Sequence, residues 1–193
     1  MSNRDALRKL SRKFPLPPEI DKIMDSLRQG TDLAVAITAT SIVEAHLERL
    51  LTTKFIWRKK ELAGQIFLNR GPLSDFHSKI LVAEAFGHVT PNMAQELHSL
   101  KAIRNVFAHA KVPITFEHEL IAREVASLRM FTAIQDAEKE TGHKLELSPK
   151  AWFLLVTKTL LILFDTIQKH HGNADDAIRD ALGKQQKTSQ EKS

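Results

Sequence analysis

The densest mixture of reactive and apolar side chains lies at residues 97–110, where Arg104, Asn105 and His109 stand among leucine, isoleucine, valine and phenylalanine. On a helix of about 100° per residue, the apolar side chains share one broad arc. Asn105 and His109, four residues apart, lie together on the opposite arc. Arg104 is the exception, because it points toward the apolar side. A guanidinium keeps its charge in a protein, so a buried one needs an acidic or carbonyl partner.

A partner for Arg104 can be predicted from the long apolar helix expected at residues 32–55. Its most apolar stripe contains one acid, Glu44, in line with Ile37, Leu47 and Leu51. We therefore predict that Glu44 and Arg104 form a buried ion pair, whose loss would cost about 3–5 kcal/mol. Two interpretations stay open. The pair fixes only the register of the two helices, or it holds Arg104 ready for phosphate or a partner subunit.

A family resemblance rests on four pieces of sequence in a fixed order. Residues 104–109 (RNVFAH) resemble the signature of the HEPN superfamily of helical domains. Residues 71–80 (GPLSDFHSKI), 85–87 (AFG) and 114–116 (ITF) complete a pattern similar to the mannitol operon repressor-like (MtlR-like) proteins. Together the pieces run over roughly residues 32–130. The first 30 residues and the last 60 or so have no counterpart in this pattern.

The HEPN resemblance implies a metal-independent endoribonuclease of a toxin or defence system. In that family Arg104 would steady the charge of an RNA phosphodiester and His109 would move protons, with Asn105 as the polar residue of the motif. Five residues turn a helix by about 500°, so Arg104 and His109 point about 140° apart. One chain therefore makes a poor site unless the helix ends near His109, and the family usually assembles this site at a dimer interface. In the alternative interpretation, His109 caps the end of its helix.

The MtlR resemblance implies a bacterial regulator of transcription linked to sugar-alcohol uptake. The chain shows no helix-turn-helix with a basic recognition helix, so such a regulator would act through another protein or through other nucleic-acid contacts. Of the net charge of +5, residues 1–14 hold +4, from five cations and one carboxylate. This arm could touch phosphate, or it could be a solvated amphipathic helix. The candidate nucleic-acid-binding residues are Arg4, Arg8, Lys9, Arg12 and Lys13. Removing residues 1–14 should weaken nucleic-acid binding without affecting folding.

Composition narrows the remaining functions. The 193 residues include no cysteine, so the chain cannot form disulfides, use a thiol in catalysis or bind zinc through cysteine. No two histidines have the four-residue spacing of a helical metal site, and no glycine-rich phosphate loop, GxSxG elbow or dinucleotide fingerprint occurs. We expect no metal and no cofactor. No signal peptide is visible, and the most apolar run, residues 151–164, is too short to span a bilayer. A cytoplasmic protein with no membrane partner is expected.

Capping residues, proline breaks and apolar periodicity predict an all-α chain. The predicted N-terminal caps are Thr31 or Asp32, Ser74, Thr90 and Ser148. The predicted helices cover residues 3–13, 19–29, 32–55, 61–68, 75–87, 91–110, 117–141, 149–170 and 173–182. We divide the chain into a basic arm with a proline-rich break (1–18), one helical domain (19–182) and a disordered polar tail (183–193).

The fold class expected is an up-and-down helical bundle of the HEPN/MtlR-like type with additional terminal helices. The function expected first is a non-enzymatic MtlR-like regulator of gene expression, as a homodimer. The alternatives are the endoribonuclease and a structural or interaction scaffold. A solvent-lined cleft holding both Arg104 and His109 would favour the nuclease. Arg104 paired with Glu44, with His109 turned away, would favour the other two.

Overall fold

The structure is a computed structural model that describes residues 17–55, 61–68, 70–128 and 147–169, with six further residues near the N-terminus. Those six are Asn3, Ala6, Leu7, Leu10, Phe14 and Pro15. The helices are α2 (Pro17–Arg28), α3 (Asp32–Thr52), α4 (Glu61–Phe67), α5 (Phe76–Ala85), α6 (Pro91–His109), α7 (Glu119–Ala126) and α9 (Pro149–Lys169). Within these described ranges there is no strand, and the predicted all-α bundle is confirmed.

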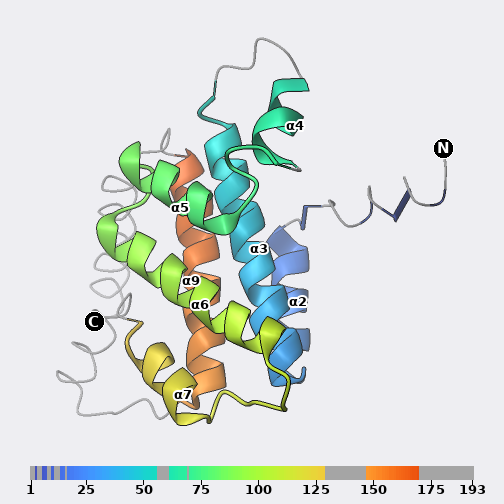
Figure 1. Ribbon diagram of the computed structural model, residues 1–193, viewed down its shortest axis with the longest axis vertical. Helices are drawn as coiled ribbons and strands as arrows, with labels where there is room; N and C mark the ends of the chain where they lie inside the picture. Colours follow the sequence, from blue (N-terminus) through green and yellow to red (C-terminus); the bar gives the residue numbers. More distant parts are fainter. Residues whose placement is uncertain are drawn as a thin grey trace, which may run out of the picture.

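Helix α3 lies at the centre of the bundle and packs most extensively against α9 and α6 (Figure 1). It runs beside α9 in the same direction, and Lys150 at the start of α9 pairs with Asp32 at the start of α3 at 3.3 Å. Helix α6 packs against α3, α5 packs on both α3 and α6, and α2 contacts α3 and α9. Because α3 is apolar on most of its circumference, it can be covered by neighbours on several sides.

Aromatic side chains connect the helices at the base of the bundle. The rings of Phe107, Phe116 and Phe153 follow one another at centroid distances of 4.9 and 5.0 Å. The backbone N–H of Phe116 donates to the carboxylate of Asp32 at 2.9 Å, which fixes the segment after α6 onto the start of α3. This contact places the end of α6, with its candidate His109, at the rim of the core.

The predicted caps agree with the structure at three helices and differ at one. Thr31, Thr90 and Ser148 each accept a hydrogen bond from a backbone N–H three residues ahead. The prediction of Ser74 as a cap is wrong, because Asp75 takes this role and accepts from the N–H of Ser78 at 3.1 Å. The carboxylate of Asp75 also accepts from the Ser78 hydroxyl, a second bond that a serine cap would not offer.

Two helices end earlier than predicted. Helix α3 ends at Thr52 rather than near residue 55, and α7 ends at Ala126 rather than continuing toward residue 141. At the end of α7 the Ser127 hydroxyl donates to the carbonyl of Glu124, and Leu128 turns into the core. Predicted helices 3–13 and 173–182, residues 129–141 and the tail 183–193 lie wholly or largely outside the described residues.

Helix α9 is longer than the apolar run identified in the sequence. It is 21 residues long, and by length and composition alone it could cross a membrane. The apolar run 151–164 was expected to be too short, but the helix continues beyond it at both ends. Phe153, Leu160 and Phe164 are buried among neighbouring helices. A core helix of this kind passes the same test of length and composition.

Candidate functional site

Helix α6 carries the three candidate residues of the central motif and presents them in different environments. Thr90 caps the helix, Pro91 occupies its first turn, and it ends at His109. Arg104 and Asn105 are half-buried, whereas His109 is exposed at the last position of the helix. The predicted end of the helix near residue 110 is therefore confirmed, and it leaves His109 on the surface.

Arg104 faces α3, as the apolar periodicity predicts. One of its terminal nitrogens, Nη2, lies 3.8 Å from Oε2 of Glu44, and the two side chains are 28% and 22% exposed. The predicted partners are thus in contact, but at the edge of the core rather than deep inside it. The expected cost of about 3–5 kcal/mol belongs to a fully buried pair and is too large for this one.

A lysine that we did not single out from the sequence forms the tighter contacts. The Nζ atom of Lys79, on α5, lies 2.8 Å from Oε1 of Glu44 and 2.8 Å from Oε2 of Glu48. Its side chain is only 5% exposed. Burial lowers the pKa of Lys79, but its hydrogen bonds to Glu44 and Glu48 outweigh this effect and leave the pKa above its usual value. We call Glu44, Glu48, Lys79 and Arg104 the charge network.

The charge network joins three helices and balances its own charges. Two carboxylates on α3 face one cation on α5 and one on α6. Buried charges are tolerated when they are paired in this way, because each ion replaces lost hydration with a partner. Lys79 could have been found from the sequence, since it lies in the apolar stripe of its helix beside Phe76, Ile80 and Ala83. The same reasoning had identified Glu44 and Arg104.

Arg104 and His109 are not brought together by the described structure of one chain. Arg104 points toward α3, and His109 is exposed at the end of α6. Neither these two residues nor Asn105 lines the pocket described next, or the shallower hollow beside His98. In the described residues, no group of three or more histidine or acidic side chains could hold a metal ion.

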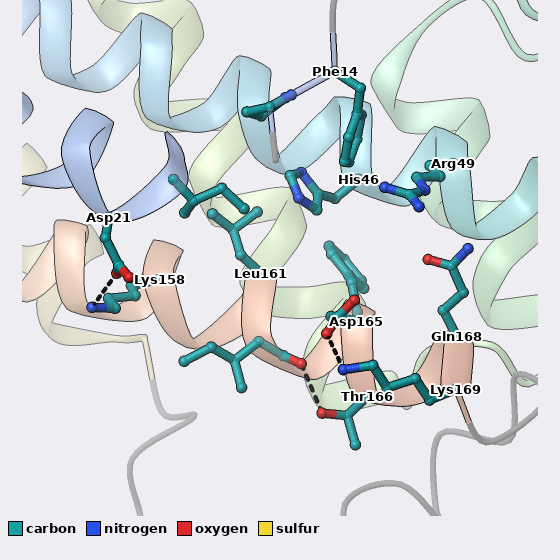
Figure 2. A pocket seen from close by; sticks show the side chains of 14 residues that line it. Phe14, Asp21, His46, Arg49, Lys158, Leu161, Asp165, Thr166, Gln168 and Lys169 are labelled. Carbon is teal, nitrogen blue, oxygen red and sulfur yellow. Dashed lines mark hydrogen bonds and ion pairs between the residues drawn. The ribbon is translucent and has the colours of Figure 1, made fainter. Parts of the chain in front are cut away.

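A second cluster lies on another face of α3, where the chain forms a pocket of about 420 Å³. We call it the α2–α3–α9 pocket. Figure 2 shows His46 and Arg49 of α3 opposite Leu161 and Asp165 of α9, with Phe14 beside them. The Phe14 ring lies 4.4 Å from the His46 ring and 4.5 Å from the Arg49 guanidinium carbon. Residues from distant segments of the chain build this pocket, so sequence spacing could not have revealed it.

His46 is the titratable group most affected by this surrounding. It is 8% exposed, and its Nδ1 lies 2.8 Å from the carbonyl oxygen of Ile42. Burial lowers the pKa of His46, and the nearby charge of Arg49 acts in the same direction. These effects outweigh the Ile42 hydrogen bond and the charge of Asp165, so the net shift of the pKa is downward and favours the neutral ring.

The candidate nucleic-acid-binding residues of the arm lie outside the described residues: Arg4, Arg8, Lys9, Arg12 and Lys13. Comparisons of the chain with protein-family models, with curated proteins and with solved structures found no match. The resemblance to HEPN and MtlR-like proteins therefore stays a prediction from the quoted motifs.

Proposed function

We propose that this chain is a non-enzymatic regulator of gene expression of the MtlR-like kind. In this proposal it is a cytoplasmic bacterial homodimer that acts through contacts with a protein partner or with nucleic acid. The observation that supports it most is the position of Arg104. Its guanidinium is engaged by Glu44 at 3.8 Å within the same chain, while His109 lies exposed at the end of α6. A nuclease would need both side chains to converge on one phosphate.

The test is an RNA-degradation assay on the full chain, in EDTA, with mixed-sequence single-stranded RNA. We expect no cleavage by the wild type and no difference from Arg104→Ala or His109→Ala. Cleavage that persists in EDTA and disappears in both variants would contradict the proposal. EDTA removes contaminating metal-dependent nucleases, and the two variants identify any cleavage that depends on the motif.

The endoribonuclease is the competing function, and one observation favours it. The Arg104 side chain is still 28% exposed, so a second copy of the chain that brings its own His109 could contact it. This arrangement would need a dimer. The RNA assay at increasing protein concentration covers it, because the dimeric nuclease would become active as the dimer forms.

A scaffold without a regulatory role would give the same negative RNA result. Deleting the gene in its native host and measuring transcripts separates these two functions. A regulator should change a defined set of transcripts, and restoring the wild-type chain should reverse that change. An unchanged transcript profile would contradict regulation and support the scaffold.

A further inference from the structure

The α2–α3–α9 pocket has the size and lining of a small-molecule site. Its volume of about 420 Å³ lies within the range of about 300–1,000 Å³ typical of ligand pockets. Its apolar surface comes from Phe14, Ile20, Leu161 and Phe164. Figure 2 shows Phe14 and Leu161 among these residues. Polar side chains make up the rest of the lining. Such a lining buries the apolar body of a ligand and leaves a few polar groups to orient it.

Among the described residues that line the pocket, both lysines have a carboxylate partner. Lys158 pairs with Asp21 at 2.9 Å, and Lys169 pairs with Asp165 at 2.6 Å. Arg49 is the remaining cation of the lining, and in the described part of the chain no carboxylate lies within ion-pair distance of it. Its guanidinium instead lies over the face of Phe14, which leaves its N–H donors for another group.

His46 is a second polar residue in the lining of the pocket. A carbonyl oxygen only accepts hydrogen bonds, so the 2.8 Å contact with Ile42 requires the proton on Nδ1 of the neutral ring. The other nitrogen, Nε2, is then an acceptor without a positive charge. The guanidinium of Arg49 and the imidazole of His46 therefore lie close together in the lining, because the two residues are three apart on α3.

We propose that the α2–α3–α9 pocket binds a small organic acid with an apolar body, its carboxylate held by Arg49 and its body packed against Phe14, Leu161 and Phe164. One guanidinium matches one carboxylate, and its planar fork of donors fits that group. A ligand with two or more charges would lack a second open cation among the described lining residues. This inference does not depend on the proposed regulatory function, since it concerns binding alone.

The test uses the full chain and two fluorescent probes of matched shape, 1-naphthaleneacetate and its neutral amide, 1-naphthaleneacetamide. We expect saturable one-site binding of the acid and at least tenfold weaker binding of the amide. Arg49→Gln should weaken the acid at least tenfold and leave the amide unchanged. The matched control is Arg123→Gln on α7, an exposed arginine paired with Glu119, which should bind both probes as the wild type does.

A second variant locates the site. Ile162 lines the pocket and is 57% exposed, so Ile162→Trp should fold normally while filling the pocket. It should abolish binding of both probes at an unchanged melting temperature. Equal affinity for acid and amide, binding of the acid that Arg49→Gln leaves intact, binding that survives Ile162→Trp, or no binding of the acid would each overturn the proposal.

Discussion

Two faces of one helix, α3, use charged side chains in opposite ways. On one face Glu44 and Glu48 meet Lys79 and Arg104, and every charge has a partner from the same chain. On another face Arg49 has no carboxylate partner among the described residues and borders a pocket instead. The first face holds three helices in register. On the second face, Arg49 lies at the pocket with its guanidinium over the ring of Phe14.

This difference shows how to separate structural from functional charges. A charged residue in an apolar stripe of a sequence indicates either a buried ion pair or a functional site, and Arg104 is such a residue. Its partner inside the chain now accounts for its position. Arg49 gives no such signal in the sequence because it lies on the exposed edge of its helix, and the structure places it in the lining of the α2–α3–α9 pocket. Whether a charged side chain has a partner within the chain therefore says more about its role than its position in an apolar stripe does.

The largest effect should come from the centre of the charge network. Lys79→Met removes the cation between Glu44 and Glu48 and leaves two partly buried carboxylates close together. We expect a loss of about 2–3 kcal/mol in the free energy of unfolding, measured by urea denaturation, because these carboxylates are partly exposed and Glu44 keeps Arg104 as a partner. Lys101→Met, on the partly exposed side of α6, is the control and should change stability by less than about 1 kcal/mol. Equal small losses would mean that the network does not hold the helices together.

A smaller loss of stability is expected at Phe14, where the basic arm meets the helical domain. Phe14 packs on His46 and Arg49, so Phe14→Ala should cost about 1–2 kcal/mol, less than a fully buried phenylalanine. Removing residues 1–13 should leave the melting temperature unchanged, whereas removing residues 1–14 should lower it. This prediction differs from the expectation that residues 1–14 can be removed without affecting folding, because Phe14 packs on α3. Identical melting of the two truncated chains would show that Phe14 contributes nothing to the body.

The contributions of the two faces to stability should also be lost at opposite ends of the pH scale. Burial lowers the pKa of His46 below its usual value of 6.5, so the unfolded chain binds the proton more readily. Stability should therefore fall as pH falls through 6.5, and His46→Asn should make the fall shallower. His109→Asn, at an exposed histidine, is the control. The pKa of Lys79 is raised, so its contribution is present below pH 10.5 and is lost only in more alkaline solution.

Thermal melts between pH 7.5 and 5.5 check the acid side of this comparison. A wild-type slope that His46→Asn leaves unchanged would assign the acid sensitivity elsewhere. The pKa of His98 is also lowered, by burial and then by the nearby His77 and Lys101. For this reason we expect His46→Asn to reduce the slope and not to remove it.

Local patterns in the sequence determined most of the fold. Thr31, Thr90 and Ser148 mark helix starts because a hydroxyl three residues before a free N–H can bond to it in any tertiary context. Ser74 was predicted in place of Asp75 because either of these adjacent residues can cap the start of α5. The early end of α7 depends on Leu128 entering the core, which is a tertiary effect that no local pattern contains.

The candidate site was only partly predictable. Apolar periodicity predicts that Glu44 and Arg104 lie on facing sides of α3 and α6. Lys79 also lies in the apolar stripe of its helix, so the same periodicity indicates a buried charge there. The pocket depended on distances between Phe14, His46 and Asp165, which are far apart in the chain. Spacing along the sequence carries information about one helix face, whereas a pocket between helices is defined by packing.

The measurement that tests the central claim most directly is a double-mutant cycle between Glu44 and Arg104. The claim is that Arg104 is held by an internal partner. Unfolding free energies of the wild type, Glu44→Gln, Arg104→Met and the double variant give the coupling between the two side chains. Glu44→Gln leaves Glu48 to pair with Lys79, so the fold should survive in all four proteins.

We predict that Arg104→Met costs about 1–2 kcal/mol, because the pair is only partly buried. The double variant should recover part of this loss, with a coupling of about 1 kcal/mol between the two residues. Losses that simply add, or an Arg104→Met protein that unfolds like the wild type, would contradict the claim. Arg104 would then be free to act on a ligand or on RNA.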